Sequence, residues 1–213
     1  MVNNQGTDKL LQMFASPKII ALVGSANSGK SNTAYWLLQQ LRERYSFNLY
    51  SYGLRVNLVG EQKIHSVEEL EVIKNSVVVL DEISSLFDLD DRQQKRQIEA
   101  SLRLIWHNAN VILLSSVPEN WKKFLAAKAD VIILKRVIIG DCINGSRVKK
   151  VITNYTGAER GSAVLNVPND IAIVYDGTHY FPISVPLMTQ FDTKAANASI
   201  LQPKTSVKSS VIA

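Results

Sequence analysis

Short apolar runs alternate with amphipathic stretches along the first two thirds of the chain. The apolar runs that suit buried strands lie at residues 18–23, 47–52, 77–80, 111–114 and 131–134. Apolar residues at helical spacing predict helices at residues 9–14, 32–45, 66–74, 91–108 and 118–128. Strands that alternate with helices form βαβ units, so the pattern predicts an α/β fold with a mostly parallel central sheet in a three-layer sandwich.

The pattern changes after the fifth of these strands. Residues 137–139 and 148–152 flank a turn that contains Asn144-Gly145, which is a strong hairpin signal. Further strand-like pieces lie at residues 163–167, 171–175 and 180–185. We therefore expect a C-terminal antiparallel β extension in place of a helical lid. The expected organisation is an N-terminal extension (1–17), one domain (18–187) with a hairpin around 136–153, and a flexible polar tail (188–213).

The connection between the first strand and its helix carries the most specific motif. Residues 24–31 read GSANSGKS and match the phosphate-binding pattern G-x-x-x-x-G-K-[ST] between a strand and a helix. Free backbone N–H groups and the helix dipole attract an anion at such a helix N-terminus. Lys30 is expected along the β- and γ-phosphates and Ser31 on Mg²⁺. The residues expected to contact the nucleotide are Gly24, Ser25, Ala26, Asn27, Ser28, Gly29, Lys30, Ser31 and Asn32.

A second motif follows about fifty residues later. The apolar run 77–80 ends in Asp81 and Glu82, at the edge of an open parallel sheet where ligands bind. This matches the Walker B pattern of P-loop proteins, in which the aspartate supports the metal and the glutamate polarises the attacking water. We expect Asp81 to hold Mg²⁺ with Ser31, and Glu82 to be the catalytic base.

Two other groups are weaker candidates. Arg92, Arg96 and Arg103 share one face of the helix predicted at 91–108. They suit a solvated face, or a trans arginine finger that reaches the γ-phosphate in a neighbouring subunit. Ser115, at the end of the strand 111–114, suits a sensor of the γ-phosphate or a cap of the next turn.

Charge is uneven along the chain. The whole sequence has a formal net charge of +5. Between residues 121 and 150, eight basic residues stand against Asp130 and Asp141, which is eight minus two, or +6. The basic residues are Lys122, Lys123, Lys128, Lys135, Arg136, Arg147, Lys149 and Lys150. This region suits either the grip of a polyanion or a lysine-rich solvated surface.

The remaining composition is that of an intracellular globular protein. Cys142 is the single cysteine, so no internal disulfide can form. No apolar run has membrane-spanning length, and residues 1–14 are too polar for a signal peptide. We expect a protein without a membrane span.

Together these residues resemble a known group of enzymes. The loop GSANSGKS, the strand VVVLDE, the strand VILLSS and the hairpin after the fifth strand resemble the ASCE division of P-loop ATPases. Within it they are most similar to the FtsK/HerA superfamily, which includes the genome-packaging ATPases of membrane-containing icosahedral viruses. The likeness covers residues 18–185. Members commonly carry a glutamine where this chain has Ser115-Ser116, which leaves the sensor open.

The resemblance implies a function and its partners. It implies an ATP-driven translocase of double-stranded DNA, with ATP and Mg²⁺ as cofactors and hydrolysis at subunit interfaces. The protein would form a homo-oligomeric, hexameric ring, with a capsid or portal-vertex protein as a further candidate partner. It would work in the cytoplasm, of the host if viral, or with the virion.

Two alternatives stay open. A nucleotide or small-molecule kinase would also carry the phosphate loop, with residues 91–103 as its lid. A nucleotide switch or assembly factor without hydrolysis is the other. A GTPase is disfavoured because the chain has no N-K-x-D motif; the nearest string, at residues 127–130, lacks the asparagine.

Overall fold

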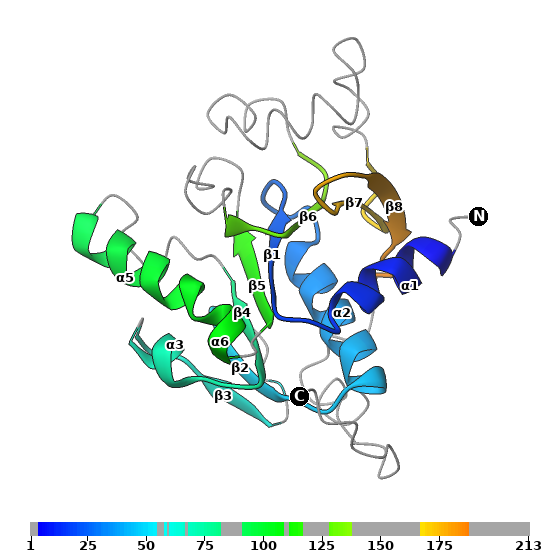
Figure 1. Ribbon diagram of the computed structural model, residues 1–213. Coiled ribbons are helices and arrows are strands. Elements are labelled where there is room, and N and C mark those ends of the chain that lie inside the picture. Colours follow the sequence, from blue (N-terminus) through cyan, green and yellow to red (C-terminus); the bar gives the residue numbers. More distant parts are fainter. Residues whose placement is uncertain are drawn as a thin grey trace.

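Eight strands form one sheet in the order β3-β2-β4-β5-β1-β6-β7-β8 (Figure 1). The computed structural model describes residues 4–54, 58, 60–66, 68–81, 91–108, 111–116, 128–137 and 167–187. Its strands are β1 (Lys18–Val23), β2 (Asn48–Tyr52), β3 (Glu61–Lys63), β4 (Ser76–Leu80), β5 (Val111–Ser116), β6 (Val131–Leu134), β7 (Ile171–Tyr175) and β8 (Tyr180–Ser184). Its helices are α1 (Asn4–Met13), α2 (Lys30–Arg44), α3 (Glu69–Val72), α5 (Arg92–Arg103) and α6 (Ile105–Asn108).

The strands are parallel from β3 to β6, and β7 runs antiparallel to both β6 and β8. β1 lies in the middle, between β5 and β6. The strands from β2 to β5 lie on one side of β1, and those from β6 to β8 lie on the other. This reversal of strand order creates a switch point at the carboxyl edge of the sheet. The mixed, mostly parallel sheet with an antiparallel C-terminal part confirms the predicted fold class.

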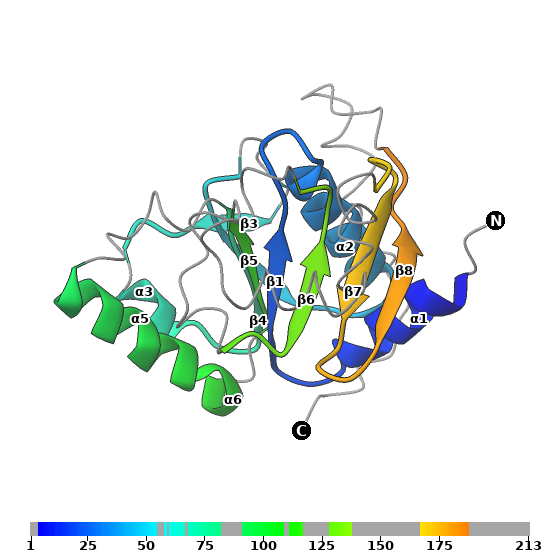
Figure 2. The same cartoon turned by 90° about the horizontal axis from the view of Figure 1, so that it is seen from above.

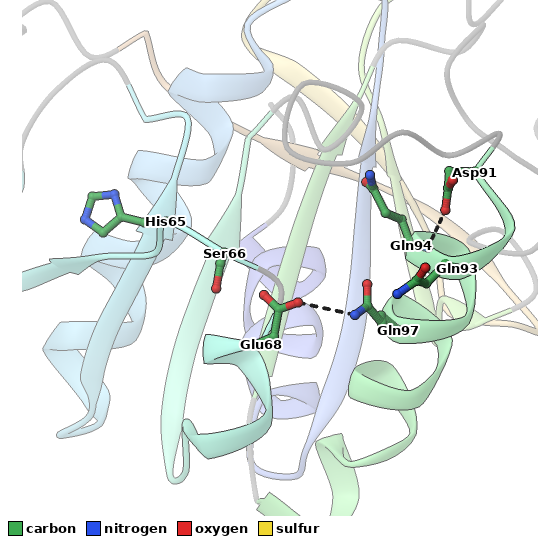
Figure 3. Close-up of a pocket in the computed structure, with 7 residues that line it drawn as sticks. All are labelled: His65, Ser66, Glu68, Asp91, Gln93, Gln94 and Gln97. Carbon is green, nitrogen blue, oxygen red and sulfur yellow. Dashed lines mark hydrogen bonds between the residues drawn. The ribbon is translucent and has the colours of Figure 1, made fainter.

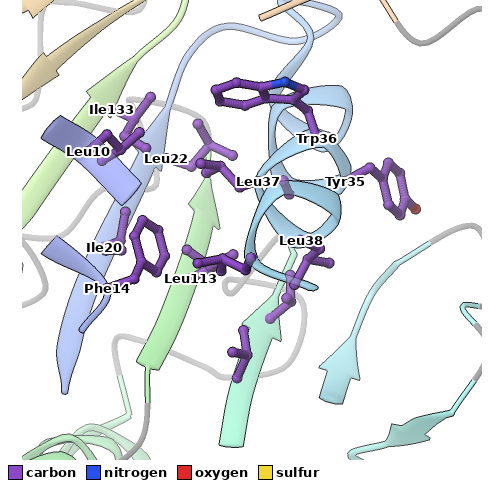
Figure 4. Close-up of a cluster of buried hydrophobic side chains, with 14 of the residues drawn as sticks. Leu10, Phe14, Ile20, Leu22, Tyr35, Trp36, Leu37, Leu38, Leu113 and Ile133 are labelled. Carbon is purple, nitrogen blue, oxygen red and sulfur yellow. The ribbon is translucent and has the colours of Figure 1, made fainter. Parts of the chain in front are cut away.

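Alternate residues of β1 enter two separate apolar layers. Ile20 and Leu22 point toward α1 and α2, where they join Leu37, Leu38 and other buried side chains (Figure 4). Leu10 of α1 is also buried in this layer. The helix therefore covers the β8 side of the sheet, as Figure 2 shows.

The other face of the sheet is covered by α3, α5 and α6 (Figure 2). Ile19 and Val23 of β1 belong to this layer, together with Ile98 and Leu102 of α5. Ile98 and Leu102 are four residues apart, so they form the buried stripe that the sequence predicted for this helix. The two helical layers and the sheet between them make the predicted three-layer sandwich.

The helices on the outer faces of the sheet differ from the predicted ranges as follows. The helix expected over 91–108 is divided at Leu104, whose N–H donates to the carbonyls of both Ala100 and Ser101, so α5 and α6 are separate. α1 begins at Asn4, five residues earlier than predicted, because it packs closely on β8 around Gly6. α3 is shorter than predicted, although the Glu69 carboxylate accepts the Ser66 N–H at 3.0 Å, as a capping box requires.

Several predicted segments lie outside the described residues. They are the hairpin around 136–153 beyond residue 137, most of the helix at 118–128, residues 163–166 and the tail from residue 188. Among the helices that the structure describes, none has the length and apolar character needed to cross a membrane.

Candidate nucleotide site

The loop between β1 and α2 occupies the carboxyl edge of the sheet at its centre. Extended backbone on both sides fixes its start: the Lys135 N–H donates to the Val23 carbonyl at 2.8 Å, and the Ser25 N–H donates to the Arg136 carbonyl at 3.0 Å. These bonds continue the pairing of β1 with β6 into the loop. The first residues of the loop are therefore held by the main chain that follows β6.

The two loop glycines meet different requirements. Gly29 has φ of +88° and is the N-cap of α2, so it adopts a left-handed conformation that residues with a Cβ rarely accept. At Gly24 the reason is space, because a Cβ there would stand 2.5 Å from Ser28 Oγ and 2.8 Å from Lys135 Cβ. The left-handed N-cap also explains why α2 begins at Lys30, two residues earlier than predicted.

Lys30 is folded back into the loop that it follows. Its side chain is buried, and its ammonium donates to the Ser25 carbonyl at 3.1 Å. The amine thus lies on the inner side of the loop, at the N-terminus of a fifteen-residue helix. An anion that entered the loop would meet this ammonium and the first N–H groups of α2 together.

The two sequence motifs meet through Ser31 and Asp81. The Ser31 hydroxyl donates to Asp81 Oδ2 at 3.0 Å, although the residues are fifty positions apart. Asp81 is only 4% exposed, and the bond from its N–H to the Tyr52 carbonyl, 2.9 Å long, fixes its backbone. The Walker A and Walker B residues are therefore adjacent in space.

The other oxygen of this carboxylate suits a cation. Asp81 Oδ1 is buried and has no hydrogen-bond partner among the described residues. A buried carboxylate oxygen without a donor is costly, and a bound cation would offset that cost. A serine hydroxyl beside a carboxylate is an oxygen donor set that fits Mg²⁺, with water and phosphate as its other ligands. Ser31 and Asp81 therefore fit the predicted metal role.

Solved structures of other proteins share the overall fold of this chain. The DNA-packaging ATPase B204 of Sulfolobus turreted icosahedral virus superposes with a TM-score of 0.57 and 15% identity, over 81% of this chain and 99% of B204. The pCW3 conjugation coupling protein TcpA superposes with a TM-score of 0.57 and 16% identity, over 82% of this chain and 61% of TcpA. The chain therefore shares the α/β fold of these two ATP-binding proteins.

This P-loop fold has been seen with nucleotides bound in a similar structure. The packaging NTPase B204 of Sulfolobus turreted icosahedral virus 2, in complex with ATP-gammaS, superposes with a TM-score of 0.54 and 14% identity, over 80% of this chain and 98% of B204. No protein-family model matches the chain, and neither does any curated protein. The fold that the resemblance implied is confirmed by these solved structures.

The other residues predicted to contact the nucleotide differ in their exposure and in their hydrogen-bond partners. Ala26 and Asn27 are exposed at the tip, where Asn27 has φ of +58°. The Asn32 amide donates to the Pro186 carbonyl at 3.1 Å and so connects the first turn of α2 to the segment after β8. The backbone of Ser115 pairs with Leu22 of β1, which brings the end of β5 beside the P-loop.

The structure does not bring the remaining predicted catalytic residues that it describes together at the loop. Glu82 lies outside the described residues. Arg92, Arg96 and Arg103 are exposed along α5, and the first and last of them are roughly 16 Å apart along the helix axis. An exposed position agrees with both roles considered for them, the solvated face and the finger toward a neighbour.

A separate polar cavity of about 470 Å³ lies between the segment before α3 and the start of α5 (Figure 3). Gln97 donates across it to Glu68 at 3.3 Å. It is lined by His65, Ser66, Glu68, Asp91, Gln93, Gln94 and Gln97. No residue of the P-loop lines it, so it is distinct from the candidate nucleotide site.

Sequence reasoning assigned Lys135 wrongly and missed Gly53. Lys135 was counted in the basic region for a polyanion, but its side chain is 0% exposed and lies behind the P-loop. The buried apolar strand that precedes Lys135 could have indicated that its side chain is buried, whereas its charge suggested an exposed position. Gly53, which follows β2, belongs to none of the sequence motifs, yet it lies against the backbone of Asp81.

Proposed function

We propose that this chain is an ATPase that uses hydrolysis at the P-loop to move double-stranded DNA. The observation that carries the proposal is the contact between Ser31 and Asp81, which joins the phosphate loop to a buried carboxylate with one free oxygen. A simple anion-binding loop has no need of that carboxylate. A loop that handles a metal-bound triphosphate does.

Different residues of the chain would bind the nucleotide, hold the metal and promote hydrolysis. Lys30 exchanges the Ser25 carbonyl for phosphate oxygens and holds the β- and γ-phosphates. The N–H groups at the start of α2 hold the same anion from the backbone. Ser31 and Asp81 would hold Mg²⁺, which neutralises charge on the phosphate oxygens when bound. Glu82, the next residue after Asp81, is proposed to orient the attacking water.

The coupling to DNA is supported by the kind of proteins that share the fold. B204 is described as a DNA-packaging ATPase, and TcpA as a conjugation coupling protein. The basic residues between 121 and 150 other than the buried Lys135 support the same idea, since movement along DNA without sequence preference needs phosphate contacts. We propose a homo-oligomeric ring, hexameric in its simplest form, in which an arginine of one subunit completes the site of the next. A viral packaging role, with a capsid or portal-vertex partner, is the most specific form of the proposal.

A hydrolysis assay with and without double-stranded DNA tests the proposal. Phosphate release is measured at low and high salt, and the mass of the assembled protein is measured under the same conditions. We expect DNA to stimulate turnover, and salt to reduce the stimulation because phosphate contacts release counterions. DNA-indifferent turnover by an assembled ring would contradict translocation. Phosphate transfer to a nucleoside monophosphate without DNA would indicate a kinase instead.

Two variants separate binding from chemistry. Lys30→Ala should abolish nucleotide binding, whereas Glu82→Gln should retain binding and stop hydrolysis. Lys74→Ala, at an exposed lysine that precedes β4, is the matched control and should behave as the unmodified protein. Normal turnover in Glu82→Gln would remove that residue from the mechanism. Tight nucleotide binding without turnover under any condition would indicate a switch.

A further inference from the structure

Lys135 has an unusual environment for a lysine. It directly follows β6, its side chain is 0% exposed, and it is among the largest fully buried side chains of the described residues. Burial of an ammonium is costly, and lysine is almost never fully buried without a partner. A leucine or methionine of similar size would fill this space at lower cost. The lysine therefore calls for a reason other than packing.

The aliphatic part of the side chain runs behind the P-loop, between its two glycines. A Cβ built on Gly24 would stand 2.8 Å from Lys135 Cβ, and one built on Gly29 would stand 3.6 Å from Lys135 Cε. The side chain thus follows the loop from its first glycine to its last. Its backbone N–H bonds to Val23, just before the loop. A change of shape at Lys135 would be transmitted to both ends of the loop.

The amine of Lys135 connects the loop to the antiparallel part of the sheet. It donates to the carbonyl of Asn169 at 2.7 Å and to that of Ile171 at 2.9 Å, at the beginning of β7. The same nitrogen lies 3.9 Å from where a Cβ of Gly29 would stand. Lys135 therefore contacts the loop and the start of β7 with one side chain.

The two carbonyl bonds do not by themselves require a positive charge. A neutral amine has two N–H groups and can donate both bonds. Burial lowers the pKa of Lys135 to about 8, while Asp170 acts in the opposite direction. Two basic residues adjoin this position: Lys30 follows Gly29, whose built Cβ would stand 3.9 Å from the Lys135 amine, and Arg136 follows Lys135 directly. An anion in the loop would supply the negative charge that favours the ammonium.

We propose that Lys135 is a positioning residue of the nucleotide site, whose side chain supports Gly24 and Gly29 and whose ammonium adds positive charge behind the bound phosphates. The inference rests on the proposed function, because it requires a nucleotide in the loop. It adds a residue outside the P-loop pattern to the site. It also makes the start of β7 part of the support of the loop.

Binding of AMP, ADP and ATP to the full chain tests the proposal. Lys135→Met keeps the length of the side chain and removes the charge and the donors. We expect ATP affinity to fall roughly 10-fold, ADP affinity less and AMP affinity least, since the attraction grows with the charge of the ligand. Lys74→Met, at an exposed lysine before β4, is the matched control and should leave all three affinities unchanged. A purely structural lysine would lower the three affinities by the same factor.

A second measurement needs no variant. At pH 8.5 a Lys135 that is partly neutral should take up a proton when ATP binds, because the phosphates raise its pKa. The number of protons taken up is obtained from the binding enthalpy of ATP, measured by calorimetry in buffers with different ionisation enthalpies. Lys135→Met should abolish the uptake. If the unmodified protein binds ATP without proton uptake and Lys135→Met binds it equally well, the inference is wrong and the proposed function stands. If the unmodified protein binds no nucleotide, the proposed function fails and the inference fails with it.

Discussion

Gly53, at the end of β2, lies directly against the backbone carbonyl of Asp81. A Cβ at position 53 would overlap that oxygen, and the residue has φ of +76°, a left-handed conformation. Gly53→Ala should therefore shift the backbone that carries the Asp81 carboxylate. We expect hydrolysis to fall at least roughly tenfold, because small displacements of positioned groups are costly for catalysis. Steady-state phosphate release measures the effect.

Gly60→Ala is the control for that substitution. Gly60 has φ of +70°, but a Cβ there would have no neighbour within 4 Å among the described residues. Both variants thus carry the same left-handed backbone strain, roughly 1–2 kcal/mol, and only Gly53→Ala adds the overlap with Asp81. Equal activity of the two variants would mean that the contact at Gly53 does not position Asp81.

Asp81→Asn should raise stability while it lowers activity. The carboxylate is buried and one of its oxygens has no partner among the described residues, so a neutral amide costs less to bury there. The amide oxygen can still accept the bond from Ser31. We expect the nucleotide-free variant to gain about 1 kcal/mol in the free energy of unfolding, and to lose most Mg²⁺-dependent hydrolysis. Thermal unfolding with and without Mg²⁺ and ATP measures both, and a less stable Asp81→Asn would contradict the cation-site interpretation.

The titration of the buried Lys135 amine should appear in the pH dependence of the free energy of unfolding. Its pKa is about 8 in the folded protein and roughly 10.4 in an unfolded chain. Between these values the unfolded state binds more protons, so this residue makes stability rise with pH from about 8 to about 10.4. Below pH 8 both states carry the proton and the dependence vanishes. Urea unfolding at several pH values, compared with Lys135→Met, isolates the contribution; identical slopes would show that the lysine does not titrate in this range.

Much of the central fold could be predicted from short local patterns. β1 and β6 were predicted with both ends correct, and β4 within one residue, because short apolar runs rich in β-branched residues are typical of strands buried on both faces. The phosphate loop was evident because its pattern constrains eight successive positions. The contact of Ser31 with Asp81 followed from the two motifs, since both lie at the carboxyl edge of one parallel sheet.

What sequence reasoning missed depends on contacts between distant segments. The charge of Lys135 suggests a surface, and only its packing behind Gly24 and Gly29 shows otherwise. The break at Leu104 interrupts a continuous helical pattern, so periodicity could not locate it. α1 begins before Gly6, a weak helix former, because its packing on β8 outweighs local preference.

That packing of α1 depends on Asp176, in the turn between β7 and β8. Asp176 accepts a bond from Lys9 of α1 at 2.7 Å and others from the N–H groups of Thr178 and His179. Burial raises the pKa of Asp176, but hydrogen bonds from Lys9, His179 and Thr178 together hold it well below its usual value. A lowered pKa contributes stability above the unfolded value, about 3.9, and the contribution is lost as pH falls below it. The turn should therefore stabilise the protein at neutral pH and progressively less in acid.

Asp176→Asn tests this contribution against Asp8→Asn. Asp8 also forms a 2.7 Å ion pair, with Arg44, but more than half of its side chain is exposed at 55%. Exposed pairs contribute about 0–1 kcal/mol, whereas loss of the half-buried charged acceptor at Asp176 should cost about 1–3 kcal/mol. Urea unfolding at pH 7 should therefore separate the two variants, and at pH 3 the difference should shrink because the carboxylates of the unfolded chain are then largely protonated. If both variants were destabilised equally at pH 7, Asp176 would be an ordinary surface charge and the docking of α1 would depend on its apolar side chains alone.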